Sequence, residues 1–189
     1  MRALPVPDLP LPDADARAHS ERLKLRVREE IDRSGGWIPF ARYMDLALYA
    51  PGLGYYAAGA TKLGAAGDFV TAPEMTPLFA RALSTQVAAI LAVSERREIL
   101  ELGGGSGRLA ADLLGALAAR DASPSRYVIL EPSPDLRSRQ RTTIARDAAA
   151  HLAGVEWIDT LPASIDGVVI ANEVLDAMPI HLVARIGNA

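Results

Sequence analysis

Residues 99–110 read ILELGGGSGRLA, a short apolar run with one acid, Glu101, near its end and then four glycines within five positions. An apolar run of this kind is typical of a buried strand in a parallel sheet. Glycines permit positive φ angles and let backbone amides approach a ligand more closely than any residue with a Cβ. The stretch therefore predicts a strand, a tight turn and the start of a helix, which is where nucleotide-like cofactors bind in open α/β sheets.

Three further apolar runs follow the glycine turn, at residues 127–130, 155–158 and 168–171, with helical stretches between them. Apolar strands that alternate with helices indicate a parallel sheet covered on both faces. Four strands make only half of a doubly wound sheet, and the last strand would keep an unpaired edge. We therefore expect further sequence, or a second copy of the chain in a homo-oligomer, to cover that edge.

The predicted organisation has three parts. Residues 1–16 hold four prolines and three acids, which predicts a disordered arm. Residues 17–95 form a helical region, and a stretch within it that is poor in large side chains, 57–67, is a candidate lid loop. Residues 96–189 form a partial Rossmann-like domain.

Helical periodicity places three helices in the N-terminal region. The first is expected from residue 17 to residue 33, where apolar positions recur every fourth residue, and the second opens at Pro39. The third runs to about Val93 from a capping box, in which the Thr71 hydroxyl and the Glu74 carboxylate satisfy free amides.

Composition excludes several classes of function. A net charge of −3 without a basic cluster argues against nucleic acid as a partner. The chain has no cysteine, and its histidines, His19, His151 and His181, lie far apart, so no metal site is expected. No apolar run approaches the ~18 residues that span a bilayer, and the first residues do not form a signal peptide. These features favour a cytoplasmic protein without a membrane segment.

Two acids indicate what the glycine turn would hold: one points to a ribose, and the other chooses between two cofactors. Glu131 follows the next strand, and a carboxylate at that position can accept both hydroxyl protons of a ribose. The glycines also satisfy the dinucleotide fingerprint from Gly105 to Ala110, which leaves an NAD-dependent oxidoreductase as an alternative. Glu101 separates the two, because a carboxylate at the base of the turn repels a pyrophosphate and attracts the ammonium and sulfonium of S-adenosylmethionine.

Polar residues also follow the third and fourth strands. Trp157 and Asp159 could meet an adenine ring and its amino group, although a core tryptophan and a surface acid explain them equally well. Asn172, Glu173 and Asp176 follow the fourth strand at the same edge, where they are placed to hold a methyl acceptor. The alternative is a helix N-cap, with Asn172 as the cap and the two acids near the positive helix end.

Four segments together resemble one known family. They are WIPFARYMDLALYAPGLGYY at 37–56, GDFVTAPEMTPLF at 67–79, ELGGGSGRLA at 101–110 and NEVLDAMP at 172–179. From about residue 20 onward the chain resembles the MidA-like family of S-adenosylmethionine-dependent methyltransferases, which includes the mitochondrial methyltransferase that assists assembly of respiratory complex I. Family members continue through further strands, so the resemblance covers roughly their first half.

The resemblance implies an α/β fold with a class I methyltransferase (Rossmann-like) sheet, incomplete at its C-terminal side and preceded by a helical N-terminal region. It implies methyl transfer to an arginine of a partner protein, with a respiratory complex I subunit as the candidate. A non-catalytic assembly factor on the same fold is a further alternative. The residues that match the family's cofactor motif are Glu101, Gly103, Gly105, Gly107 and Glu131.

Two further motifs of the family match this chain, one in the lid segment and one facing the acceptor. The residues that match the lid motif are Gly67, Asp68, Phe69 and Glu74, and those that match the acceptor motif are Asn172, Glu173 and Asp176. A guanidinium stays protonated at neutral pH, so carboxylates must orient it. We assign that role to Glu173, with Asp68 and Asp176 as helpers, although Asp68 could instead cap a turn and Glu74 could only complete the capping box.

Overall fold

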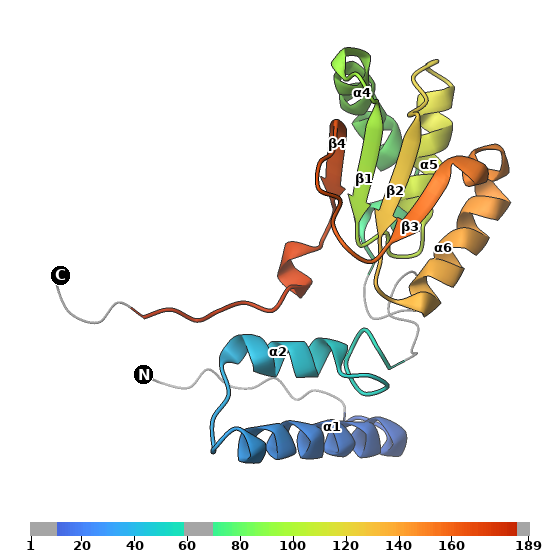
Figure 1. Ribbon diagram of the computed structural model, residues 1–189. Helices are drawn as coiled ribbons and strands as arrows, with labels where there is room; N and C mark the ends of the chain where they lie inside the picture. Colours follow the sequence, from blue (N-terminus) through green and yellow to red (C-terminus); the bar gives the residue numbers. More distant parts are fainter. Residues whose placement is uncertain (1–10, 59–69, 185–189) are drawn as a thin grey trace, which may run out of the picture. The chain divides into compact units, whose positions relative to one another are not determined.

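A four-stranded parallel sheet lies in one of the two compact units of the chain, residues 59–177 (Figure 1). Residues 1–58 and 178–189 make up the other unit. The structure, a computed structural model, describes residues 11–58 and 70–184. The strands are β1 (Glu98–Leu102), β2 (Arg126–Leu130), β3 (Val155–Ile158) and β4 (Gly167–Ala171).

Each of the four predicted apolar runs is a strand, and neighbouring strands are parallel in the order β3-β2-β1-β4. The predicted α/β fold, with helices before a parallel sheet, is therefore confirmed. β4 is an outer strand of the described sheet. Covering of its edge by further sequence or by a second copy stays a prediction.

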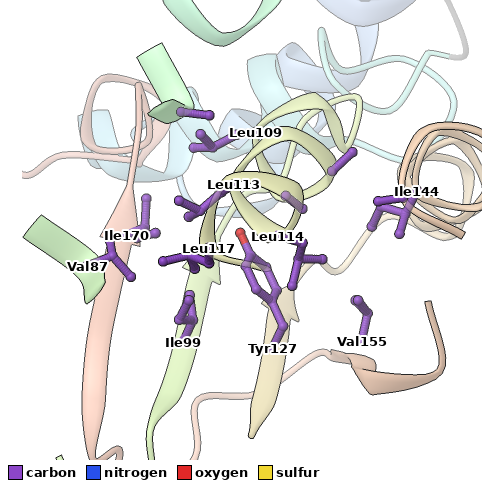
Figure 2. Packing of buried hydrophobic residues seen from close by; sticks show 14 of the residues in the cluster. Val87, Ile99, Leu109, Leu113, Leu114, Leu117, Tyr127, Ile144, Val155 and Ile170 are labelled. Carbon is purple, nitrogen blue, oxygen red and sulfur yellow. The ribbon is translucent and has the colours of Figure 1, made fainter. Parts of the chain in front are cut away.

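The sheet unit includes two helices, α3 (Ala72–Met75) and α4 (Leu78–Val93), in the stretch where one helix of the N-terminal helical region was expected. It also contains α5 (Arg108–Ala118), α6 (Pro134–Asp147) and the 3-10 turns η1 (Ala149–Gly154) and η2 (Leu175–Ala177). Helices α4, α5 and α6 bury apolar side chains against one sheet face, which carries Ile99, Tyr127, Val155 and Ile170 (Figure 2). Burying one such side chain stabilises the fold by about 1.5–3 kcal/mol, so this cluster gives the sheet a rigid base.

The prediction that both sheet faces are covered holds in part for the described residues, because on the face opposite Ile99 the central residues Leu100 and Val128 are 3% and 0% exposed but the outer strand β4 is not covered. Val169 points to the face opposite that of its neighbour Ile170, and it is 51% exposed. Residues 159–166, which join β3 to β4, contain no helix. A connection between parallel strands usually needs a dozen or more residues to contain a helix. The connection is therefore too short for the helix that would cover Val169.

The helix predicted from residue 71 to about residue 93 is interrupted at Thr76. Its first part, α3, ends at Met75, and α4 begins at Leu78, with Thr76 extended at φ −165° and ψ 142°. The cause is Pro77, whose ring clashes with a helical conformation of the residue before it. Apolar periodicity continues across the break, which is why the pattern indicated one helix.

The other unit contains α1 (Ala14–Arg33) and α2 (Phe40–Tyr49). α1 begins at Ala14 rather than at residue 17, because Asp13 caps it by accepting a hydrogen bond of 2.7 Å from the Ala16 amide. Arg42 of α2 forms an ion pair of 2.7 Å with Glu30 of α1, which ties the two helices together. Within the described ranges, no helix combines the length and the apolar character needed to cross a membrane.

Candidate functional site

The carboxyl ends of the four strands lie in register and form one edge of the sheet. Ile158, Leu130, Leu102 and Ala171 are successive partners across the sheet. The residues that follow them, in the same order, are Asp159, Glu131, Gly103 and Asn172. Open parallel sheets bind their ligands at this edge. The register therefore brings four predicted site residues to adjacent positions.

The glycine turn, residues 103–107, joins β1 to α5. Gly103, Gly105 and Gly107 have positive φ angles of 62°, 54° and 85°, a conformation that glycine adopts at little cost. A Cβ on Gly107 would lie 2.8 Å from the Cα of Gln140 in α6, and one on Gly103 would lie 3.3 Å from the side chain of Val174. The turn thus requires glycine where α6 and the segment after β4 approach it.

Glu101 is 3% exposed and lies on the sheet face that α4, α5 and α6 cover, which it shares with Ile99. The Tyr127 hydroxyl donates a hydrogen bond of 2.8 Å to its Oε2 atom. Burial raises the pKa of Glu101 to about 7; the bond from Tyr127 opposes this rise and the charge of Glu131 adds to it. The sequence placed this acid at the base of the turn, and the structure buries it there against a tyrosine.

Glu131 is 4% exposed at the end of β2, and both of its carboxylate oxygens accept hydrogen bonds. Oε1 accepts from the Ser133 amide at 3.0 Å, and Oε2 accepts from Nε2 of Gln140 at 3.1 Å. Burial raises the pKa of Glu131, while these two bonds and the charge of Arg137 act in the opposite direction. The carboxylate predicted to bind ribose is therefore held in a fixed orientation.

Trp157 and Asp159, considered for adenine, lie in different surroundings. The indole Nε1 of Trp157 donates to Oε1 of Gln140 at 2.8 Å, and the Arg141 guanidinium lies 3.9 Å from the ring centroid. These contacts and its packing against the core give Trp157 a structural role. Asp159 is exposed at the edge, beside Glu131, so it remains available to a ligand.

Glu74 does not complete the predicted capping box. Thr71 makes no side-chain cap hydrogen bond at the start of α3. Instead, the hydroxyl of Ser106 in the glycine turn donates to the Glu74 carboxylate, and Ser106 also accepts from the Arg108 amide at 3.2 Å. Residues 71–74 are therefore bound to the glycine turn through a contact between residues 32 positions apart.

Asn172, Glu173 and Asp176 follow β4 without the α-helix that Asn172 was considered to cap. The described chain after β4 has one 3-10 turn, η2, and then no regular structure up to residue 184. Glu173 is exposed with a positive φ of 52°, which costs a residue other than glycine of order 1 kcal/mol or more. Asp176 is also exposed, and Asn172 is half-buried. The acceptor residues thus stand on irregular backbone at the sheet edge.

The remaining predictions fall outside the described residues. Gly67, Asp68 and Phe69, together with most of the predicted lid loop at 57–67, belong to the range 59–69. Their proposed roles stay predictions.

Gln140 and Tyr127 had no predicted role, although each leaves a signal in the sequence. Gln140 lies four residues from both Leu136 and Ile144, so the three side chains share the face of the helix that is buried. A polar residue on such a face needs a buried partner. Tyr127 likewise lies in a strand expected to be fully buried, so its hydroxyl needs an acceptor.

Comparison with known proteins matches the chain to a family. Residues 78–189, more than half of the chain, match the model of a family described as "Putative S-adenosyl-L-methionine-dependent methyltransferase". Mitochondrial protein arginine methyltransferase NDUFAF7 homologs of Drosophila melanogaster and Caenorhabditis elegans are 31% and 30% identical to the chain over 201 and 179 residues. The matches cover 90% and 83% of this chain but 44% and 42% of those relatives. The chain thus spans less than half the length of these relatives.

Solved structures match the fold over nearly the whole chain. A crystal structure from Burkholderia thailandensis, bound to S-adenosyl-homocysteine, has a TM-score of 0.84 and 51% identity, and covers 91% of this chain and 46% of that protein. A second structure from the same organism has a TM-score of 0.80 and 49% identity, and covers 92% of this chain and 44% of that protein.

Proposed function

Because this chain belongs to the family of S-adenosyl-L-methionine-dependent methyltransferases, we propose that it binds S-adenosylmethionine at the carboxyl edge of its sheet and donates the methyl group to an arginine of a partner protein. The observation that carries the proposal is the register of the edge. It sets Glu131, fixed by two hydrogen bonds, beside a turn in which three glycines hold positive φ angles. Glycine backbone and a carboxylate in these positions fit the amino acid part and the ribose of the cofactor.

The charges near the turn favour this cofactor over a dinucleotide. Glu101 and Glu131 are both buried, and Glu131 raises the pKa of Glu101. Glu131 does not distinguish the two cofactors, because dinucleotide sites also carry a carboxylate for the ribose. The ionised form of Glu101 opposes a bound pyrophosphate and attracts an ammonium and a sulfonium, and a bound cation in turn favours that ionised form. The glycines alone admit both ligands, so Glu101 supports the choice.

When bound, S-adenosylmethionine supplies a methyl group on a sulfonium, which a nucleophile displaces in line. Such a displacement needs positioning more than acid–base catalysis. We assign Glu131 to the ribose hydroxyls and Asp159 to the adenine amino group. Glu173, with Asn172 and Asp176, would orient the guanidinium. Transfer would break the bond between sulfur and the methyl group and leave S-adenosyl-homocysteine, while the methylated nitrogen would lose one proton to solvent.

Calorimetric titration tests the cofactor. S-adenosyl-homocysteine is expected to bind the chain, and NAD is not. Glu131→Gln should weaken binding at least tenfold, because an amide cannot accept from both ribose hydroxyls with a full charge. Glu95→Gln, at an exposed acid in the loop before β1, is the matched control and should leave the affinity unchanged. NAD binding with no response to S-adenosyl-homocysteine would overturn the assignment in favour of an oxidoreductase.

The names of the relatives, which are protein arginine methyltransferases, support arginine as the acceptor. We propose an arginine of a respiratory complex I subunit. Transfer of labelled methyl groups from S-adenosylmethionine to purified complex I subunits, read out as methylarginine by mass spectrometry, tests this. Glu173→Gln should lower kcat at least tenfold with little change in the affinity for S-adenosyl-homocysteine. Full activity of Glu173→Gln would remove Glu173 from the acceptor site.

A further inference from the structure

Gln140 connects three separate parts of the candidate site through one buried amide. It is fully buried in α6, a helix whose other buried residue is Ile144. Its Nε2 atom donates to the Gly105 carbonyl and to Oε2 of Glu131, both at 3.1 Å, and its Oε1 atom accepts from Nε1 of Trp157 at 2.8 Å. One side chain thus contacts the glycine turn, the end of β2 and β3.

The three partners leave the amide a single orientation. An indole N–H only donates, so it must face the amide oxygen, while a carbonyl and a carboxylate accept from the two amide hydrogens. Both hydrogens of Nε2 are then used. The amide cannot rotate by half a turn without breaking all three bonds, so Gln140 is locked in place.

Gln140 also packs closely against the glycine turn. A Cβ on Gly107 would lie 2.8 Å from its Cα and 3.1 Å from its carbonyl oxygen, and a Cβ on Gly104 would lie 3.3 Å from Nε2. The turn therefore rests on residue 140 at two of its glycines. The same residue therefore contacts both the turn and the Glu131 carboxylate.

We propose that Gln140 is a positioning residue of the cofactor site, acting through Glu131. This inference rests on the proposed function of the same edge. Glu131 keeps one restraint, the Ser133 amide, when Gln140 is removed, and its second oxygen then loses its partner. An apolar residue of the same length would fill the space but leave the carboxylate free to turn. The amide thus sets the direction in which Glu131 presents its lone pairs to the ribose.

A double-mutant cycle measured with S-adenosyl-homocysteine tests the proposal. Gln140→Met keeps the length of the side chain and should weaken binding about tenfold. When Glu131→Gln is already present, adding Gln140→Met should weaken binding no further, because the residue acts through the lost carboxylate. Gln86→Met, at an exposed position of α4, is the matched control and should bind like the wild type.

The outcomes separate this inference from the function on which it rests. Two outcomes would overturn the role of Gln140 but leave the proposed function standing. One is wild-type affinity of Gln140→Met for S-adenosyl-homocysteine, and the other is a double variant whose loss of affinity equals the product of the two single losses. Failure of the wild-type chain to bind S-adenosyl-homocysteine would overturn both. Gln140→Glu is a second variant of nearly identical shape. It replaces Gln140→Met if that variant fails to fold. Its negative charge would lie beside Glu131, so it should weaken the binding of S-adenosyl-homocysteine at least tenfold.

Discussion

Gly167→Ala is expected to disrupt the β4 edge of the sheet and to lower the free energy of unfolding by at least about 3 kcal/mol. Gly167 opens β4 at φ +151°, and a Cβ there would lie 1.9 Å from the carbonyl oxygen of Glu98 in β1. Glu98 cannot retreat, because its amide donates to the Asp166 carbonyl at 3.0 Å and its buried carboxylate accepts from the Asp166 amide at 3.1 Å. The overlap must therefore be relieved by separating β4 from β1.

Urea unfolding checks this result. Trp157 lies in the sheet unit and Trp37 in the other, so in a Trp37→Phe background the emission of Trp157 follows the sheet alone. Gly154→Ala is the control, since a Cβ at Gly154, just before β3, would meet no atom within 4 Å. It should change the free energy of unfolding by less than about 1 kcal/mol. Equal stability of the two variants would show that β1 and β4 can separate at no cost.

The stability of the sheet unit should fall by about 3 kcal/mol as pH rises from 4.5 to 8 because of Glu101. Its pKa is 4.5 in a model peptide and about 7 in the fold. Between these values the folded state binds more protons than the unfolded state, so rising pH favours unfolding. Burial also raises the pKa of Glu131, which acts in the same direction. Glu30 and Asp147 have lowered pKa values, so their contributions are lost only below this window.

Glu101→Gln isolates this effect, because the amide is neutral at every pH and can still accept from the Tyr127 hydroxyl. Urea unfolding at several values between pH 5 and pH 8, read by Trp157 emission, should give a steeper loss for the wild type than for the variant. At pH 8 the variant should be the more stable of the two. Parallel curves would mean that Glu101 is ionised throughout this range in the folded chain.

The strands were predictable because their burial leaves a local pattern. Each apolar run is a strand. The strands β1, β2 and β4 begin one residue before the predicted run, because pairing extends them. The position of the edge residues follows from the same pattern, since the residue after a buried parallel strand emerges at the rim. Glu131 and Asn172 therefore lie where the sequence placed them.

The errors arose where distant residues decide the outcome. The Thr71 and Glu74 pattern satisfies the capping rule, but Ser106, 32 residues further on, provides the partner of Glu74. Nothing local records that contact. By contrast, the break at Thr76 had a local cause in Pro77, which the apolar periodicity outweighed in the prediction. The burial of Glu101 also has a local signal, because residues two apart in a strand point to the same face and Ile99 is apolar.

The hydrogen bond between Ser106 and Glu74 limits how this site can be transplanted. A glycine turn with its strand and helix is often treated as a portable cassette that a designer grafts onto another α/β scaffold. Here the turn is held from outside the cassette by Glu74 before it and by Gln140 after it. A graft of residues 98–118 alone would carry the sequence signature without the supports that shape it. The smallest transferable module therefore extends from α3 to α6.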